Sequence, residues 1–228
     1  MNPSASSHRL RLARLLLIVV GLGLWFWTQS LIGSKAPVAG ANGIGDAILT
    51  WTAPWNAWLN AHPGPANALL IASSAGIDAL GLFLLGMTIF GRTVRPFLGL
   101  LLLFSLRQVC QSLISLPPIE GMIWRDTGVP TLLVTYGVSN DLFFSGHTAL
   151  AVFGTLELAR LGKRSLVVLA VLIGLFEVSA VLVLRAHYSM DVFAGAVTAL
   201  FIGLIVEKLA PPVDAWLNRV TGKVVSQG

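Results

Sequence analysis

The sequence predicts an all-α integral membrane protein: a bundle of six transmembrane helices with a short interfacial helix in the first outer loop. Of the 228 residues, 55% are hydrophobic and only 11% are charged, and the mean hydropathy is +0.81. Soluble domains carry roughly a quarter charged residues. The apolar runs are continuous rather than alternating, which argues against a membrane β-barrel. We expect one membrane-embedded domain over residues 1–228.

Six apolar runs have about the 20 residues that a spanning helix needs. They cover residues 12–33, 67–90, 97–116, 142–160, 165–184 and 189–209. An alternative interpretation makes the first run a signal peptide, with Ala39-Gly40-Ala41 as a small-residue cleavage site. The length of this run, its tryptophans Trp25 and Trp27, and the distance to the cleavage site favour a span.

A tryptophan cluster follows the Gly/Pro-rich segment after the first run. Trp51, Trp55 and Trp58 lie within nine residues. Tryptophan is enriched at the headgroup level of membranes, so this segment predicts the short interfacial helix, with anchoring as its role.

The basic residues predict the orientation of the spans. They gather before the first span and in alternate connections: Arg9, Arg11, Arg14, Arg92, Arg95, Arg160, Lys163, Arg164, Lys208, Arg219 and Lys223. The other connections hold only Lys35 and Arg125. Both termini are therefore expected in the cytoplasm. The net charge of +5 is explained by this asymmetry, so we expect no nucleic-acid partner.

Two short motifs carry the chemistry. Ser145-Gly146-His147-Thr148 begins the fourth span, and Arg185-Ala186-His187-Tyr188-Ser189-Met190-Asp191 joins the fifth to the sixth. With six spans and cytoplasmic termini, both motifs lie in the outer half of the membrane. Ionisable groups at that depth are costly and are functional candidates by default. The predicted site therefore faces the extracytoplasmic side, below a long outer loop at residues 117–141.

These residue types suit attack on a phosphate ester. Asp191 lies four residues after His187, where its carboxylate can orient the ring and leave the other nitrogen as a nucleophile. His147 can protonate the leaving group. Gly146 and the Ser145 hydroxyl can cradle a phosphate.

Two arginines, Arg107 and Arg185, can stabilise the negative charge of a phosphate. No metal or other cofactor is then required. A site of two histidines and one carboxylate for a metal is the rival interpretation, which the nearby arginines disfavour because they repel a cation. Ser-Gly as a packing contact and Asp191 as a helix cap are the structural alternatives.

The motifs resemble the type 2 phosphatidic acid phosphatase superfamily, in particular its sphingomyelin synthase-like branch. Ser145-Gly146-His147 matches the superfamily's Ser-Gly-His motif, and the segment from His187 to Asp191 resembles the branch's His-Tyr-Thr-x-Asp motif. Plant phosphatidylcholine:diacylglycerol cholinephosphotransferases share Phe-Phe-Ser-Gly-His and an arginine two places before the second histidine, here Arg185. The resemblance implies His187 as the nucleophile of a phosphohistidine-type intermediate.

The resemblance also implies that Asp191 orients His187, that His147 serves the leaving group, and that Arg107 is the branch's upstream arginine. Two departures weaken a plain phosphatase interpretation. The arginine six residues before the second histidine is Val181 here, and the lysine of the Lys-x6-Arg-Pro string is Thr88, although Arg95-Pro96 is present. We interpret Arg95 as a cytoplasmic charge.

The expected function is a membrane enzyme that transfers a phospho-headgroup from a phospholipid to a lipid alcohol. A lipid phosphate phosphatase that uses the same residues is one alternative, and a non-catalytic transporter or scaffold on this fold is another. The sequence leaves the headgroup, the acceptor and the oligomeric state open. Two charged residues, Glu177 and Asp78, lie within expected spans. Each is interpreted either as a member of a structural pair, such as Glu177 with Arg107, or as a contact to the acceptor.

Overall fold

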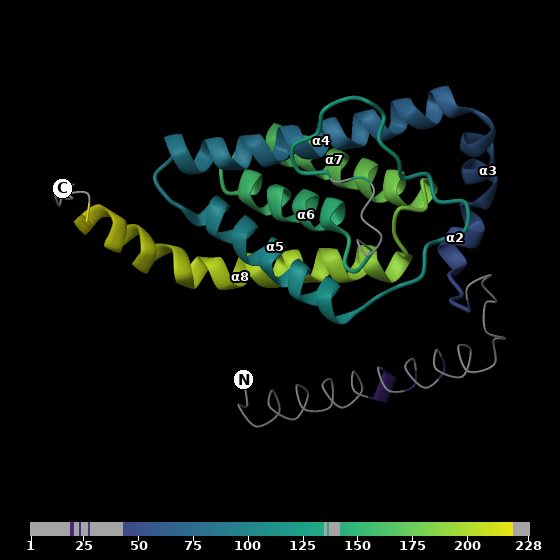
Figure 1. Cartoon of the computed structure of the whole chain (residues 1–228). Helices are drawn as coiled ribbons and strands as arrows, with labels where there is room; N and C mark the ends of the chain where they lie inside the picture. The colour runs from purple at the N-terminus through teal and green to yellow at the C-terminus, as the bar shows by residue number, and fades with distance from the viewer. Residues whose placement is uncertain are drawn as a thin grey trace, which may run out of the picture. The chain divides into compact units, whose positions relative to one another are not determined.

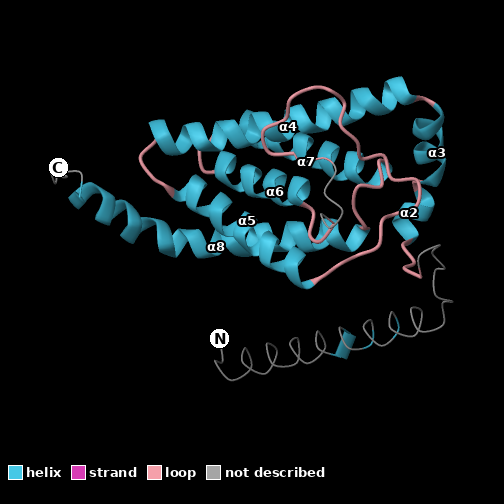
Figure 2. Cartoon of the chain, in the orientation of Figure 1, coloured by secondary structure: helices cyan, strands magenta, loops and turns pink. Residues whose placement is uncertain are grey.

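The part of the chain that the structure describes is built of helices and loops alone (Figure 2). This computed structural model describes residues 43–134, 136 and 142–220, together with residues 19, 20, 23 and 27. The chain divides into two units, residues 1–39 and 40–228, and all of the named helices belong to the second. These helices are α2 (Ala47–Trp51), α3 (Ala53–Ala61), α4 (Pro63–Phe90), α5 (Arg95–Leu113), α6 (Gly146–Ala159), α7 (Arg164–Val183) and α8 (Ser189–Val220). The all-α class is confirmed for the described residues of this unit, and a single domain over the whole chain stays a prediction.

Four of the described helices, α4, α5, α7 and α8, are long and apolar enough to cross a membrane. They correspond to the expected spans at residues 67–90, 97–116, 165–184 and 189–209. The expected span at residues 12–33 lies outside the described residues apart from four isolated positions, as does the alternative cleavage site at residues 39–41. Six spans are therefore not confirmed.

The expected span at residues 142–160 differs from the structure. Helix α6 has only 14 residues, which gives it a length of about 21 Å, against the ~30 Å of a bilayer core. The helix is short because Ser145 caps its N-terminus and residues 142–145 lie outside it. Helix α6 packs against α4, α5, α7 and α8, so it is the central helix of the bundle (Figure 1).

Small residues let the neighbouring helices approach α6 closely. A Cβ atom added to Gly154 would lie 2.7 Å from the side chain of Leu80, and one added to Gly195 would lie 2.5 Å from the carbonyl oxygen of Ser145. The second contact joins α8 directly to the backbone at the start of α6. Gly195 therefore helps to set the position of the Ser-Gly-His motif.

We expect Gly195→Ala to destabilise the protein by about 1–3 kcal/mol, because the new methyl group overpacks a contact with backbone that cannot rotate away. Gly174→Ala in α7 is the matched control, since an added Cβ there meets nothing within 4 Å. Thermal unfolding of both variants in detergent measures the difference. Equal unfolding temperatures would contradict the close approach of α8 to Ser145.

At the far end of the bundle, the interpretation of Arg95 as only a positive-inside loop charge is wrong, while the side of the membrane on which it lies stays a prediction. Arg95 is only 7% exposed, forms an ion pair with the buried Glu157 of α6 and donates to the carbonyl of Gly203 in α8. The sequence did not predict this pair, because its members are 62 residues apart. Buried charges require partners, and this pair ties α5, α6 and α8 together.

Helix α8 is longer than the expected span, which ended at residue 209. It continues through Pro211 and Pro212 to Val220. The carboxylate of Asp214 accepts hydrogen bonds from the Thr93 hydroxyl at 2.6 Å and the Val94 amide at 2.8 Å. These bonds attach the C-terminal part of α8 to the connection between α4 and α5.

The tryptophan cluster forms two short helices instead of the one expected. Trp51, Trp55 and Trp58 are 72%, 62% and 51% exposed on α2 and α3. On the other side of α3, the buried Asn56 donates to the carbonyls of Gly121 and Val183. One face is thus anchored to the bundle and the indole rings remain outside it, which agrees with an interfacial role.

Candidate active site

The Ser-Gly-His motif forms the N-terminus of α6. The Ser145 hydroxyl accepts from the Thr148 amide at 3.3 Å and from the Thr148 hydroxyl at 3.1 Å, and its residue is fully buried. It is therefore the helix N-cap. Gly146 lies against Arg107, because an added Cβ would be 3.1 Å from the arginine Nε. The missing side chain of Gly146 leaves room for the guanidinium group.

The second motif forms the turn between α7 and α8. Arg185 has a φ of 55°, a left-handed conformation that ends α7. The Ala186 amide then donates to the Val181 carbonyl at 2.9 Å, which closes the turn. His187 follows immediately and is only 3% exposed. The motif thus places this histidine just before the N-terminus of α8.

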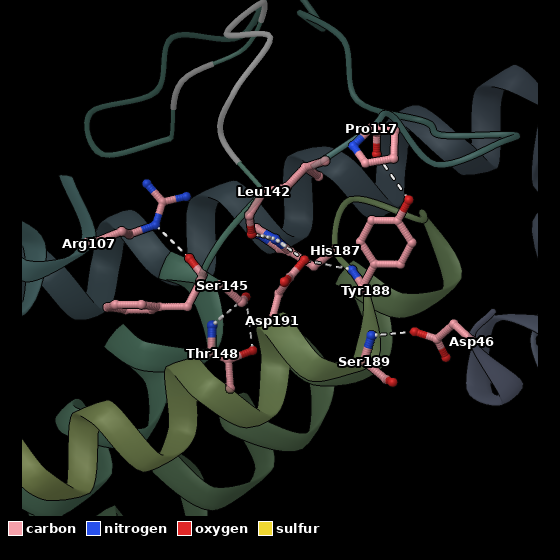
Figure 3. Close-up of polar contacts among 11 residues, drawn as sticks. Asp46, Arg107, Pro117, Leu142, Ser145, Thr148, His187, Tyr188, Ser189 and Asp191 are labelled. Carbon is pink, nitrogen blue, oxygen red and sulfur yellow. Dashed lines mark hydrogen bonds and ion pairs between the residues drawn. The ribbon is translucent and has the colours of Figure 1, made fainter. Parts of the chain in front are cut away.

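A backbone carbonyl, which the sequence did not reveal, orients His187. The Nδ1 atom lies 2.7 Å from the Leu142 carbonyl oxygen (Figure 3). A carbonyl can only accept, so Nδ1 carries the proton and Nε2 of the neutral ring carries the lone pair. The expected hydrogen bond from His187 to Asp191 is replaced by this contact, because the nearest carboxylate oxygen lies 3.8 Å from Nδ1.

Asp191 instead caps α8. Its Oδ2 atom accepts from the Tyr188 amide at 2.9 Å, as the side chain at helix position N3 does in a capping box. Asp46, which precedes α2, accepts from the Ser189 amide at 2.7 Å with its Oδ2 atom (Figure 3). Two carboxylates therefore hold the start of α8. Asp191 is close enough to stabilise positive charge on His187 without bonding to it.

His147 and His187 line the same pocket, of about 130 Å³, together with Arg107 and Gly146. The Nε2 atom of His147 is buried and has no hydrogen-bond partner among the described residues. Its ring meets Trp124 edge to face, with centroids 5.4 Å apart. The pocket thus combines two imidazole rings and one guanidinium group in an otherwise largely apolar wall.

Three other predicted site residues, Ser145, Arg185 and Asp191, are not among the described residues that line this pocket. The Nη1 atom of Arg185 donates to the Glu120 carbonyl, and Nη2 is 3.4 Å from the Leu49 carbonyl. Its guanidinium group therefore links the outer loop to α2.

The loop at residues 117–141, expected to be an outer loop, forms part of the pocket wall with its described residues. Pro118, Met122, Trp124, Leu133 and Val134 contribute to the pocket wall. Residues 135 and 137–141 of the expected loop, 117–141, lie outside the described residues.

Hydrogen bonds to α4 and to the turn between α7 and α8 hold the described part of this loop. The Tyr188 hydroxyl donates to the Pro117 carbonyl at 3.0 Å, and the Ile123 amide donates to the Leu184 carbonyl at 2.8 Å. The carboxylate of Asp78 accepts from the amides of Leu132 and Leu133. The charge within α4 thus supports the loop.

Glu177 pairs with Ser73 and not with Arg107. The Ser73 hydroxyl donates to Glu177 Oε2 at 2.6 Å, while Arg107 Nε donates to the Phe144 carbonyl at 2.8 Å. Glu177 is thus held by Ser73, and Arg107 by the Phe144 carbonyl. The structural interpretation of Glu177 is therefore favoured, with a serine as its partner.

The two contacts of Asp191 can be separated by mutation. Asp191→Asn retains an oxygen for the Tyr188 amide but removes the charge near His187, so we expect a loss of turnover with little loss of stability. Asp191→Ala removes the cap as well and should cost about 1 kcal/mol of unfolding free energy. Denaturation and kinetics of both variants test this. If Asp191→Asn turns over normally, its charge has no part in the reaction.

A comparison with protein families matches the AtPDCT1/2 family, the phosphatidylcholine:diacylglycerol cholinephosphotransferases, over residues 46–209. The matched segment starts at Asp46, the cap of α2, and includes both histidine motifs. Searches of curated proteins and of solved structures found no match. The cholinephosphotransferase part of the resemblance is thus confirmed, while membership of the phosphatidic acid phosphatase superfamily stays a prediction. With a match over more than two thirds of its length, this chain belongs to the AtPDCT1/2 family.

Proposed function

We propose that this protein transfers phosphocholine from phosphatidylcholine to the hydroxyl group of a diacylglycerol. The family match supports the reaction class. The observation that carries the mechanism is the shared pocket of His147 and His187, in which the Leu142 carbonyl leaves the lone pair of His187 on Nε2. No metal takes part in the proposed steps.

In the first step, the lone pair of His187 Nε2 forms a bond to phosphorus. The bond from phosphorus to the glycerol oxygen breaks, and the electron pair leaves with that oxygen, which takes a proton from His147. The negative phosphodiester favours the protonated form of His147 before this step. The products are diacylglycerol and a phosphocholine group on His187, whose ring is now positively charged.

In the second step, the hydroxyl oxygen of an acceptor diacylglycerol attacks phosphorus. Its proton goes to His147, the bond between phosphorus and Nε2 breaks, and the electron pair returns to His187. The cycle consumes no water and restores both histidines. The leaving group and the attacking group are both diacylglycerol hydroxyls of similar reactivity, so the reaction is close to thermoneutral.

The surrounding residues support this cycle in different ways. We assign to Arg107 the stabilisation of the phosphate charge, because it lines the pocket beside the bare backbone of Gly146. Asp191, 3.8 Å from His187 Nδ1, stabilises the charged ring of the intermediate. We assign positioning roles to Ser145 and Arg185, since their polar groups bind the protein itself.

The covered pocket favours transfer over hydrolysis. Its wall is mainly apolar and includes five residues of the outer loop. Exclusion of water is one way to protect a reactive intermediate from hydrolysis. The diacylglycerol is a bilayer lipid, so we propose that it reaches the pocket from the membrane. In keeping with the distribution of basic residues, the site would face the extracytoplasmic leaflet, with both termini in the cytoplasm.

Partition of the headgroup tests this proposal. Purified protein in vesicles receives phosphatidylcholine labelled in the choline methyl groups, with increasing amounts of a diacylglycerol whose acyl chains differ. We expect labelled phosphatidylcholine with the new acyl chains as the main product. If free phosphocholine dominates at every diacylglycerol concentration, the protein is a hydrolase, and if neither product forms, it is not an enzyme of this class.

A further inference from the structure

A second pocket, of about 690 Å³, lies next to the histidine pocket and is lined by residues of the outer loop. The two pockets have Trp124 and Val134 in common. Trp124 also touches His147, with ring centroids 5.4 Å apart. If the phosphate of a ligand lies between the histidines, a group that is joined to this phosphate through two methylenes can therefore lie against Trp124.

An aromatic pair forms part of the wall of this second pocket. The rings of Trp124 and Tyr136 have centroids 5.0 Å apart and are inclined by 50°. The Tyr136 hydroxyl is hydrogen-bonded to the Ser74 hydroxyl at 2.6 Å, which attaches this ring to α4. Two inclined aromatic faces held in place are the usual receptor for a quaternary ammonium group.

The carboxylates around the aromatic pair also favour a cation. Burial raises the pKa of Tyr136 above its usual value, and the carboxylates of Asp126 and Asp78 raise it further, whereas the Ser74 hydrogen bond lowers it. Asp126 itself lines the pocket. The one guanidinium group among the described lining residues, that of Arg125, donates twice to the Asn67 side chain, at 3.2 and 2.8 Å.

We propose that Trp124, Tyr136 and Asp126 form a binding site for the quaternary ammonium group of the choline headgroup, next to the phosphate site between the histidines. The inference rests on the proposed function and names the residues that select its donor. A trimethylammonium group has no N–H to donate and binds through aromatic faces and negative charge. A primary ammonium group prefers direct hydrogen-bond acceptors and is more strongly hydrated, so the aromatic pair discriminates against ethanolamine headgroups.

Binding of soluble headgroups tests the site without turnover. Saturation-transfer NMR is recorded with phosphocholine and with phosphoethanolamine, on protein in a detergent that lacks choline. The wild-type protein should bind phosphocholine more tightly and transfer saturation most strongly to its methyl protons. Tyr136→Leu should weaken phosphocholine binding by about 3- to 30-fold and leave phosphoethanolamine almost unchanged, whereas Asp126→Asn should weaken the binding of both headgroups. Tyr136→Phe retains the ring and should retain the preference.

Trp55→Leu is the control, because it removes an indole ring that is 62% exposed and outside the pocket. Unchanged phosphocholine binding in both Tyr136→Leu and Asp126→Asn, or equal binding of the two headgroups by the wild-type protein, overturns the assignment. A transfer assay on the same samples separates this failure from that of the proposed function. Wild-type transfer with unchanged headgroup selectivity in Tyr136→Leu rejects only the ammonium site, whereas selective binding without any transfer rejects the enzyme.

Discussion

Replacing His187 with alanine is expected to reduce headgroup transfer by at least about 1,000-fold, because the covalent route is lost with the nucleophile. The ring's Nδ1 atom bonds only to the Leu142 carbonyl among the described hydrogen bonds, so the fold should survive the change. Transfer of labelled phosphocholine measures the loss. Incubation without diacylglycerol should give the wild-type protein a labelled adduct that is acid-labile and base-stable, and the variant should give none.

His62→Ala is the matched control for this experiment. His62 lies on the exposed end of α3, where it stacks on Trp58 with centroids 4.6 Å apart, and it does not line the pocket. Its loss should leave transfer and the adduct intact. An adduct of normal yield in His187→Ala would move the nucleophile to another residue and refute the assignment.

Replacing His147 with alanine is expected to slow transfer from phosphatidylcholine by about 10²- to 10⁴-fold, the usual contribution of general acid catalysis. Protonation matters most for a poor leaving group such as the glycerol oxygen. With p-nitrophenyl phosphocholine, whose leaving group departs without a proton, the first step should be much less affected. The second step still needs a base, so the variant should release one burst of nitrophenol and then turn over slowly.

Stopped-flow absorbance measures the burst, and its amplitude counts the active sites. The wild-type protein is the reference for the burst rate, and His62→Ala again controls for loss of an imidazole ring. If His147→Ala slows the burst as much as it slows the transfer from phosphatidylcholine, His147 is not the proton donor. Its role would then be confined to shaping the pocket beside Trp124.

The position of the two histidine motifs could be predicted from the sequence because helix ends follow local rules. Apolar runs end where polar residues interrupt them, and this pattern places His147 near the start of the fourth run and His187 between the fifth and the sixth, which correspond to α6, α7 and α8. Alternation of basic loops implies that both motifs lie at the same end of the bundle. The structure brings both rings into one pocket at that end.

The roles of individual polar groups were not predictable in the same way. Asp191 was expected to orient His187 because the two residues are four apart, yet the carboxylate caps α8 and a carbonyl takes its place. Sequence spacing limits which side chains can meet, but it says nothing of backbone atoms that arrive from another segment. Leu142 is 45 residues from His187 and contributes only its carbonyl oxygen.

By itself, the sequence determined that the protein is helical and apolar, where most of its described long helices begin and end, and which two histidines meet. These properties depend on hydropathy, periodicity and helix-capping residues, which are local. Only the tertiary structure decided that α6 is a short central helix, that Arg95 and Glu157 form a buried pair, and that Arg185 binds the loop instead of the pocket. Each of these depends on contacts between residues that are distant in the chain, because burial determines which partner a polar group must find.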